Sequence, residues 1–216
     1  MTSRNNPTNI TVVHCQKEIG TKSNRYKISF DNGVSCRVYG GDVRQFGLIE
    51  GNELSFEVYR ELMEDVLAKR AKKRALHLLE RMEQTQWQLR TKLEKAGYPS
   101  ECIEDALAYV QSYHYVDDSR FASNFVRISQ EKMSKGNISR KLLSKGVDRE
   151  IVKQALEEYE SDELQQICKL LEKRGFQKET AYRRELQRTY AFLARRGFCN
   201  SDILKALSLD ISVEKV

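Results

Sequence analysis

Three fifteen-residue segments decide the fold: LEKAGYPSECIEDAL at 93–107, LLSKGVDREIVKQAL at 142–156 and LARRGFCNSDILKAL at 193–207. Each segment begins with a leucine, places a glycine four residues later and ends on Ala-Leu. The spacing between successive glycines is 49 and then 51 residues. Self-similarity at such a period is the signature of a tandem repeat.

The physical logic of one repeat can be read from these segments. The glycines Gly97, Gly146 and Gly197 stand where a helix must end, in the left-handed conformation that costs glycine least. The polar residues that follow them, Ser100, Asp148 and Asn200, are predicted to cap the next helix. The apolar residue six positions after each glycine and the Ala-Leu pair then share one helix face.

Two further helices precede each glycine. Leu89 and Leu93 mark the second helix of the first unit, and Ile138 and Leu142 mark that of the second. The apolar residues of the first helices are Ala75, Leu78 and Met82, then Phe121, Phe125 and Val126, then Ile167, Leu170 and Leu171. The sequence therefore predicts a mainly α protein whose tandem three-helix units form an elongated curved rod with one long concave surface.

Residues 10–39 have the alternation of β-strands instead. The segment ITVVHCQ at 10–16 predicts one strand, and Asn32-Gly33 is predicted to supply the positive φ angles of a tight hairpin turn. The two strands of that hairpin carry Tyr26, Ile28 and Phe30, and Val34, Cys36 and Val38. We thus expect a small N-terminal β unit.

These patterns divide the chain of 216 residues into four parts. The predicted parts are a β unit at 1–52, a linker helix with the first repeat at 53–116, the second repeat at 117–160, and the third repeat with a short tail at 161–216.

Composition narrows the class of protein. No apolar run approaches the roughly 20 residues that span a bilayer, and the polar N-terminus does not resemble a secretion signal. A cytoplasmic protein without a membrane partner is expected. The 5 cysteines are scattered, so buried, reduced thiols are favoured over a metal site or a disulfide framework.

Charge alternates along the repeats. Residues 69–95, 127–149 and 173–196 carry net charges of +6, +5 and +6, whereas 50–65, 101–118 and 150–163 each carry −5. Arg70, Arg74 and Arg81 share a helix face, and Arg184, Arg188 and Arg195 repeat the same spacing. The candidate binding residues are Arg70, Lys73, Arg74, Arg81, Arg90, Lys92, Arg127, Lys135, Arg140, Lys141, Arg184, Arg188 and Arg195.

The basic rows have more than one interpretation. Each could be a solvated helix surface with ordinary intrahelical ion pairs. Their threefold recurrence favours a polyanion such as DNA, contacted at phosphates without base readout, but an acidic protein surface would fit as well. Charge alone does not choose between them.

Nothing in the sequence supports catalysis, and no metal or cofactor is expected. His14, His77 and His114 lie far apart, and no catalytic or phosphate-cradling motif is present. Asp117 and Asp118 directly precede a predicted helix, so capping explains them better than a metal site. Trp87, the one tryptophan, is expected to fill a junction between helices rather than to anchor a partner.

At 115–147, YVDDSRFASNFVRISQEKMSKGNISRKLLSKGV, the sequence resembles the RecX family of recombinase regulators. The matching positions are Tyr115, Asp117, Asp118, Arg120, Phe121, Ala122, Phe125, Val126, Arg127, Lys135, Gly136, Ile138, Leu142 and Gly146. The resemblance extends over about 68–207. Ser129 departs from the family pattern, where a second arginine often follows Arg127, and the third unit lacks the DD-x-RFA element.

This resemblance implies a non-catalytic modulator of the RecA recombinase that lodges in the groove of the RecA–DNA filament and hinders ATP turnover and strand exchange. Phe121 is expected in the core, and Arg120 is expected to pair with an acidic helix. Two alternatives are an autonomous DNA-binding protein and a scaffold without a nucleic-acid role. A monomer is expected, since nothing requires a dimer.

Overall fold

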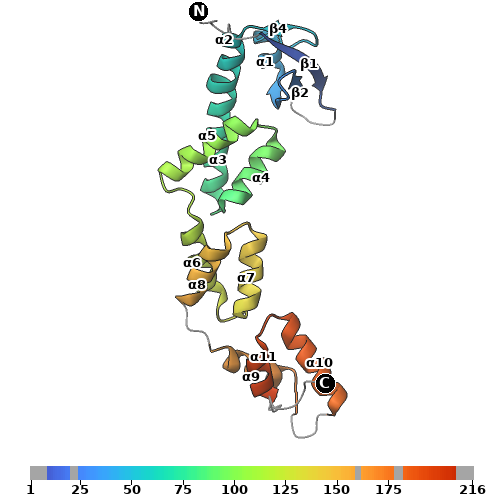
Figure 1. Cartoon of the computed structure of the whole chain (residues 1–216), viewed down its shortest axis with the longest axis vertical. Coiled ribbons are helices and arrows are strands. Elements are labelled where there is room, and N and C mark those ends of the chain that lie inside the picture. Colours follow the sequence, from blue (N-terminus) through green and yellow to red (C-terminus); the bar gives the residue numbers. More distant parts are fainter. Residues whose placement is uncertain (1–8, 20–23, 159–161, 178–181, 208–216) are drawn as a thin grey trace, which may run out of the picture. The chain divides into compact units, whose positions relative to one another are not determined.

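The computed structural model describes residues 9–19, 24–158, 162–177 and 182–207 and divides into two compact units, with the boundary between Asp117 and Asp118. Strands are confined to the first unit, and both units contain helices (Figure 1). The predicted fold class, mainly α with a small N-terminal β unit, is confirmed. Within the described residues, every helix is too short or too polar to traverse a lipid bilayer.

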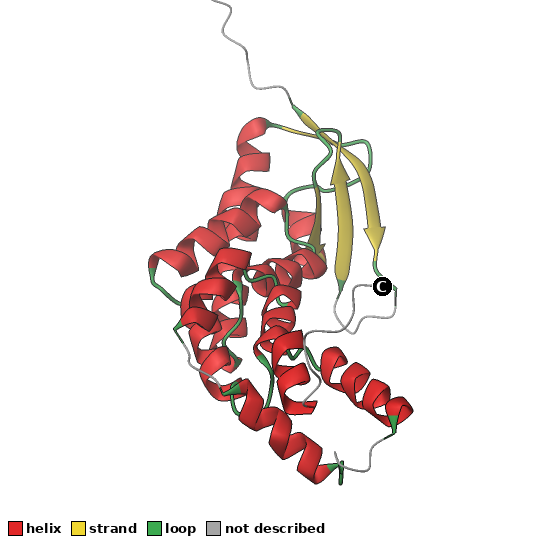
Figure 2. Ribbon diagram, turned by 60° about the horizontal axis from the view of Figure 1, so that its bottom comes forward, coloured by secondary structure: helices red, strands yellow, loops and turns green. Residues whose placement is uncertain are grey.

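The β unit is a four-stranded antiparallel sheet with the order β3-β2-β1-β4 (Figure 2). Its strands are β1 (Ile10–Lys17), β2 (Arg25–Phe30), β3 (Ser35–Tyr39) and β4 (Glu53–Leu54). The three predicted strands are confirmed. The fourth has only two residues and was not predicted, because no alternation can be read in so short a segment.

The turn between β2 and β3 differs from the expected one. Gly33 has a φ of 80°, but within the described residues only His114 combines a positive φ with a side chain, so the prediction of a positive φ at Asn32 is wrong. The N–H of Gly33 donates to Phe30 O at 3.0 Å, and Asn32 Oδ1 accepts from the N–H of Val34 at 3.1 Å. A three-residue loop ending on a left-handed glycine satisfies the same hairpin.

The helices of the first unit begin with α1 (Gly40–Gln45). There follow α2 (Phe56–Arg60), the π-helical segment η1 (Glu61–Ala68), α3 (Lys69–Arg81), α4 (Gln86–Ala96) and α5 (Ser100–Ser112). In η1 the buried residues recur every five positions, as Leu62 and Leu67 and as Met63 and Ala68. This spacing matches the i→i+5 hydrogen bonds of a π-helix.

The sheet and the first repeat share one hydrophobic core. Ile28 and Val38 of the sheet belong to the same buried cluster as Leu89, Leu93 and Leu107 of the repeat. The rings of Phe30 in β2 and Tyr59 in α2 meet edge to face, 5.2 Å apart. The β unit is therefore built onto the first repeat.

The second unit holds two three-helix groups with separate cores. The first group is α6 (Asp118–Ser129), α7 (Lys135–Ser144) and α8 (Arg149–Glu157). The second is α9 (Glu163–Lys173), α10 (Arg183–Arg195) and α11 (Asn200–Leu207).

The three repeat glycines adopt the predicted left-handed conformation, with φ values of 86° at Gly97, 80° at Gly146 and 83° at Gly197. In each turn the residue after the glycine donates its N–H to the carbonyl of the repeated leucine. The pairs are Tyr98 and Leu93 at 3.3 Å, Val147 and Leu142 at 3.2 Å, and Phe198 and Leu193 at 3.4 Å. This is the six-to-one bond of a Schellman motif. The repeated leucine therefore marks the helix end as well as the core.

The predicted caps are confirmed at one turn of three. Asp148 Oδ1 accepts from the N–H of Glu150 at 2.8 Å and caps α8. The prediction for Ser100 is wrong, because Pro99 holds the cap position of α5 without a side-chain bond. Asn200 is instead the first residue of α11, and its Oδ1 accepts from Tyr190 Oη at 2.8 Å.

Two predictions about burial are also wrong. Met82 is 69% exposed, because α3 ends at Arg81 and Met82 has already left the helix. Cys168 and Cys199 are exposed, whereas Cys36 and Cys102 are buried as expected. Burial raises the pKa of both buried thiols to about 12, which keeps them protonated and inert.

Candidate nucleic-acid and partner interface

Arg70 of α3 is held inside the first unit by a carboxylate of α1. Its Nη1 and Nη2 donate to Asp42 Oδ2 at 2.5 Å and Oδ1 at 2.8 Å. Asp42 is 5% exposed and also accepts from the N–H of Tyr39 at 2.8 Å. Burial by itself raises the pKa of Asp42, but these hydrogen bonds and the charge of Arg70 bring it below its ordinary value. Arg70 therefore clamps α3 to the β unit.

Arg90 of α4 has a similar internal role. Its guanidinium donates to both carboxylate oxygens of Glu104 in α5, and the contact to Oε2 is 2.8 Å. The hydrogen bond raises the pKa of Arg90 and lowers that of Glu104. Lys72 of α3 also faces α5, with Nζ 4.0 Å from Asp105. The acidic third helix of the first repeat thus neutralises part of the basic row beside it.

The other cations predicted in the first repeat remain available. Lys73, Arg74, Arg81 and Lys92 are exposed and form no ion pair with any residue of the described chain. Arg74 and Lys92 line a pocket together with Arg70, whereas Arg81 and Arg90 do not belong to its lining. Of the cations predicted in the first repeat, Arg70 and Arg90 therefore form ion pairs within the unit, and the other four form none with the described residues.

In the second unit, the N-terminal end of α7 packs directly on the glycine turn of the third repeat. Ser134 Oγ donates to Arg196 O at 2.5 Å, and Arg140 Nη2 donates to Arg195 O at 3.0 Å. A Cβ added to Gly136 would collide with the backbone of Gly197. Gly136 is therefore needed for the close approach of two backbones, which explains the Lys-Gly pair noted in the sequence.

Lys135 and Glu163 complete this junction. The backbone N–H of Lys135 donates to Glu163 Oε1 at 2.6 Å, so the carboxylate lies at the N-terminal end of α7. Burial raises the pKa of Glu163, and the nearby charge of Asp202 adds to the effect. Lys135 itself is half-buried, which leaves Lys141, further along α7, as the more accessible cation.

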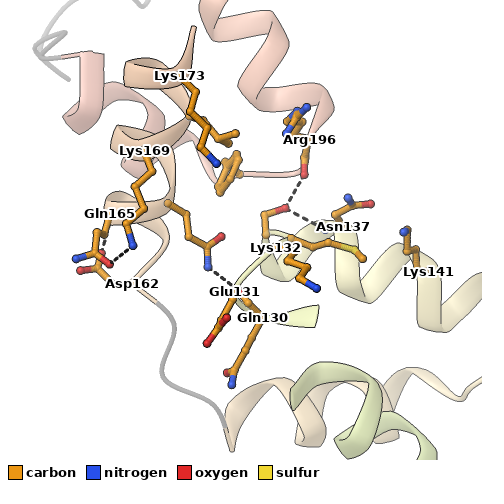
Figure 3. Close-up of a pocket in the computed structure, with 15 residues that line it drawn as sticks. Gln130, Glu131, Lys132, Asn137, Lys141, Asp162, Gln165, Lys169, Lys173 and Arg196 are labelled. Atoms are coloured by element: carbon orange, nitrogen blue, oxygen red, sulfur yellow. Dashed lines mark hydrogen bonds between the residues drawn. The ribbon is translucent and has the colours of Figure 1, made fainter. Parts of the chain in front are cut away.

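A groove of about 1060 Å³ opens beside this junction, between the loop that joins α6 to α7 and the face of α9 (Figure 3). Its cationic side chains are Lys132, Lys141, Lys169, Lys173 and Arg196; its amide side chains are Gln130, Asn137, Gln165 and Gln166. The acidic residues in the lining are Glu131 and Asp162, and Asp162 Oδ1 accepts from the N–H of Gln165 at 2.8 Å, capping α9. The groove is polar and carries excess positive charge.

Of the five groove cations, only Lys141 is among the binding residues predicted from the sequence. Lys169 and Lys173 are four residues apart on α9, so their shared face could have been read from the sequence. Lys132 lies in a loop and Arg196 follows α10, and only the packing of two repeats brings these residues to α9.

The remaining predicted cations of the second unit are exposed. Arg127 Nη2 donates to Asn124 Oδ1 at 3.3 Å. Arg184, Arg188 and Arg195 lie along α10, outside the groove lining, and form no ion pair with described residues. They offer a second basic surface in this unit.

The DD-x-RFA element contributes chiefly to structure. Phe121 is 9% exposed and lies in the core of α6–α8, with Lys145 Nζ 5.8 Å from its ring centroid. Asp118 is the first residue of α6, and Asp117 directly precedes it, as expected for residues at a helix start. Arg120 is exposed, and its pairing with an acidic helix stays a prediction.

Trp87 contradicts the preferred sequence interpretation. Its side chain lies on α4 and is 50% exposed, so it does not fill a buried junction between helices. This exposure favours the alternative interpretation, that Trp87 anchors a partner.

One group of possible metal ligands was not anticipated. The ligand atoms of Glu163, Cys199 and Asp202 all lie within 4.8 Å of one another. Hydrogen bonding already accounts for the group, because Glu163 accepts from Lys135 and Cys199 Sγ donates to Asp202 Oδ2 at 3.0 Å.

Comparison with known proteins bears directly on the three-helix repeats. Three family models match this chain: the first three-helix domain of RecX matches residues 71–109, the second matches 117–156 and the third matches 160–207. The regulatory protein RecX of Caldanaerobacter subterraneus subsp. tengcongensis is 31% identical over 191 residues, which cover 87% of this chain and 94% of that protein. The chain belongs to the RecX family.

Other RecX proteins agree with this placement. The regulatory protein RecX of Clostridioides difficile is 26% identical over 200 residues, covering 91% of this chain and 92% of that protein. The crystal structure of a regulatory protein RecX superposes with a TM-score of 0.62 at 22% identity, over 93% of this chain and all of that one. The crystal structure of RecX from Lactobacillus salivarius superposes with a TM-score of 0.58 at 20% identity, over 65% of this chain and 94% of that one. The family resemblance inferred from the sequence is confirmed.

Proposed function

We propose that this member of the RecX family is a non-catalytic, cytoplasmic regulator that binds the RecA–DNA filament as a monomer. On this proposal it inhibits the ATPase and strand-exchange activities of the filament and so modulates DNA repair and the SOS response. The observation that carries the proposal is the match of all three repeats to RecX domains. Relatives that match most of this chain are named regulatory proteins.

The charge of the second unit supports contact with a nucleoprotein. Five cations and two acids line the groove between α7 and α9, and four more arginines, Arg183, Arg184, Arg188 and Arg195, are exposed on α10. Cationic side chains without acidic partners bind phosphates and release counterions. The amide side chains of the groove add hydrogen-bond donors suited to phosphate oxygens.

A comparison of paired variants tests the proposal. Labelled protein would be titrated onto RecA–DNA filaments, naked single-stranded DNA and RecA alone, and strand exchange would be followed in parallel. We compare the wild type with Lys169→Gln/Lys173→Gln and with the control Arg149→Gln/Lys153→Gln. Both pairs are four residues apart on one helix of the second unit, but only the first lines the groove.

The wild type should bind the filament more tightly than either component and should slow strand exchange. The groove variant should weaken filament binding by about tenfold and lower the salt slope by about 1.4, which is two single-strand phosphate contacts. The control should behave as the wild type. Equal binding to filament and naked DNA, without slower strand exchange, would contradict the proposal.

The second candidate function is autonomous, sequence-independent DNA binding. The exposed arginines of α10 favour it, because they form no ion pair with described residues. The same titrations separate the two functions: an autonomous binder would bind naked DNA in a salt-dependent manner and leave RecA activity unchanged.

A further inference from the structure

A second cation-lined pocket lies in the first unit, between the sheet and the first repeat. It has a volume of about 440 Å³. The sheet contributes Arg25, Arg37 and Tyr39 to its lining, and α3, α4 and the turn after α4 contribute Arg70, Arg74, Lys92, Lys95 and Tyr98. No acidic residue is part of the lining that the described chain provides. The β unit thus supplies part of a strongly basic site.

Two of the six cations are fixed by carboxylates that lie outside the lining. Arg37 Nε donates to Glu18 Oε1 at 2.5 Å, and Arg70 is held by Asp42. The other four, Arg25, Arg74, Lys92 and Lys95, form no ion pair with described residues. Like charges gathered without counter-charges repel one another, so binding an anion here would relieve that repulsion.

The backbone keeps the pocket in shape. The N–H of Arg37 donates to Gly97 O at 2.8 Å, and its Nη1 donates to Lys95 O. A Cβ on Gly97 would collide with the aliphatic part of the Arg37 side chain. The first repeat glycine therefore ends α4 and also makes room for an arginine of the sheet.

An aromatic ring borders the cations. The guanidinium carbons of Arg25 and Arg70 lie 5.5 and 5.1 Å from the ring centroid of Tyr39, which is 44% exposed. Tyr98 is half-buried at the same pocket, and burial raises its pKa, so its hydroxyl stays protonated as a hydrogen-bond donor. Both guanidinium groups lie over the ring, which stays partly exposed. Cations together with a partly exposed aromatic ring are the combination with which proteins bind single-stranded nucleic acid.

The geometry points to a phosphodiester-binding site for single-stranded nucleic acid, formed jointly by the β unit and the first repeat, with Arg74 and Lys92 contacting phosphate and Tyr39 stacking on a base. This site gives the β unit a binding role. It deepens the proposed function and rests on it, because the strand would be the one carried by the filament. A chain of phosphodiesters fits better than one free phosphate, because the four unpaired cations come from β2, α3 and α4.

The test is fluorescence anisotropy of a labelled oligothymidylate of about 16 nucleotides, the upper end of known site sizes, with the full chain and without recombinase. The pocket variant is Arg74→Gln/Lys92→Gln. The control, Arg44→Gln/Arg60→Gln, removes two exposed arginines of the same unit outside the pocket. Tyr39→Leu and Tyr39→Phe separate stacking from the hydroxyl. Circular dichroism melting verifies that each variant is folded.

We expect the pocket variant to bind about tenfold more weakly and with a salt slope smaller by about 1.4, while the control stays within about twofold of the wild type. Tyr39→Leu should weaken binding by at least about fivefold, and Tyr39→Phe should bind as the wild type does. Equal binding by pocket and control variants, or no oligonucleotide binding by the wild type at low salt, would overturn the inference.

Competition with inorganic phosphate and with a nucleoside monophosphate tests the source of the phosphate. If these small anions displace the oligonucleotide at equimolar phosphate, the pocket is a free-phosphate site and the strand assignment is wrong. Strand exchange by RecA is measured separately on the same variants. If the wild type binds the oligonucleotide, the pocket variant binds it more weakly and the wild type has no effect on RecA, the proposed function is refuted and the pocket stands.

Discussion

Two rows of arginines have the same spacing in the sequence and different surroundings in the structure. In α3, Arg70 is bound by the buried Asp42, and Arg74 faces the basic pocket of the first unit. In α10, Arg184 and Arg188 are exposed and form no ion pair with described residues. Spacing fixes which residues share a helix face, but the compensation of their charge depends on segments distant in the sequence.

The three glycine turns likewise share one conformation and differ in their surroundings. Gly97 is contacted by Arg37 of the sheet, and Gly197 by Gly136 and Asn137 of the second repeat. Gly146 is exposed, although its φ of 80° is nearly the same as theirs. In the first and third repeats the turn is thus also a docking point for the segment that precedes the repeat.

The largest effect is expected from Gly197→Ala. An L side chain at this φ costs about 1–2 kcal/mol, and the collision with Asn137 N, 2.8 Å from the added Cβ, adds about 1–3 kcal/mol. Gly146→Ala should lower the free energy of unfolding by only about 1–2 kcal/mol, because its turn is exposed. Urea denaturation of both variants measures the difference, and equal losses would show that the second repeat does not dock on Gly197.

Asp42→Ala should lower the free energy of unfolding by about 2–3 kcal/mol, because it leaves Arg70 partly buried without its carboxylate. This is less than for a fully buried pair, since the side chain of Arg70 is 35% exposed. Glu185→Ala, which removes an exposed carboxylate of α10, should change stability by no more than about 0.5 kcal/mol. If Asp42→Ala and Glu185→Ala lowered the free energy of unfolding by similar amounts, the arginine rows of α3 and α10 would not differ in how their charge is compensated.

The same pair should make stability depend on acid pH. The pKa of Asp42 is lowered in the folded protein, so its contribution is fully present above the unfolded value of about 3.9 and is lost as pH falls through the folded value. The stability difference between the wild type and Asp42→Asn should therefore be constant from neutral pH to about 5 and shrink below about 4. Urea titrations at several pH values measure it; a difference that grows on acidification would contradict the assignment.

A smaller loss of stability than for Gly197→Ala or Asp42→Ala is expected from Trp87→Ala. Because the side chain is 50% exposed, the free energy of unfolding should fall by less than about 1.5 kcal/mol, well below the 3–5 kcal/mol of a buried tryptophan. Filament binding should weaken if Trp87 anchors a partner. A loss of about 3 kcal/mol or more would restore the interpretation as a core residue.

Local features were predictable from the sequence, and features that join distant segments were not. The glycine turns, the three strands and Phe121 were predicted correctly, because periodicity and glycine chemistry act within a few residues. The π-helical segment was not predicted, because its buried residues recur every five positions rather than every three or four. The caps at Ser100 and Asn200 failed because a shift of one residue at a helix start changes the role of a side chain.

The candidate site was predicted only in part for the same reason. Arg70 was predicted as a candidate binding residue, but its partner Asp42 lies 28 residues before it in the sequence, and no local pattern joins the two. Similarly, Lys132, Lys169 and Arg196 reach one groove only through the packing of two repeats. Which of the cations touch DNA or protein stays a prediction.

The measurement that tests filament regulation most directly is ATP hydrolysis by the RecA protein of the same organism on single-stranded DNA, with this protein titrated in at substoichiometric ratios. We predict inhibition at well below one copy per RecA, since a regulator directed at the filament acts on many protomers. Unchanged hydrolysis at all ratios, together with salt-sensitive binding of the protein to DNA alone, would contradict filament regulation and favour autonomous DNA binding.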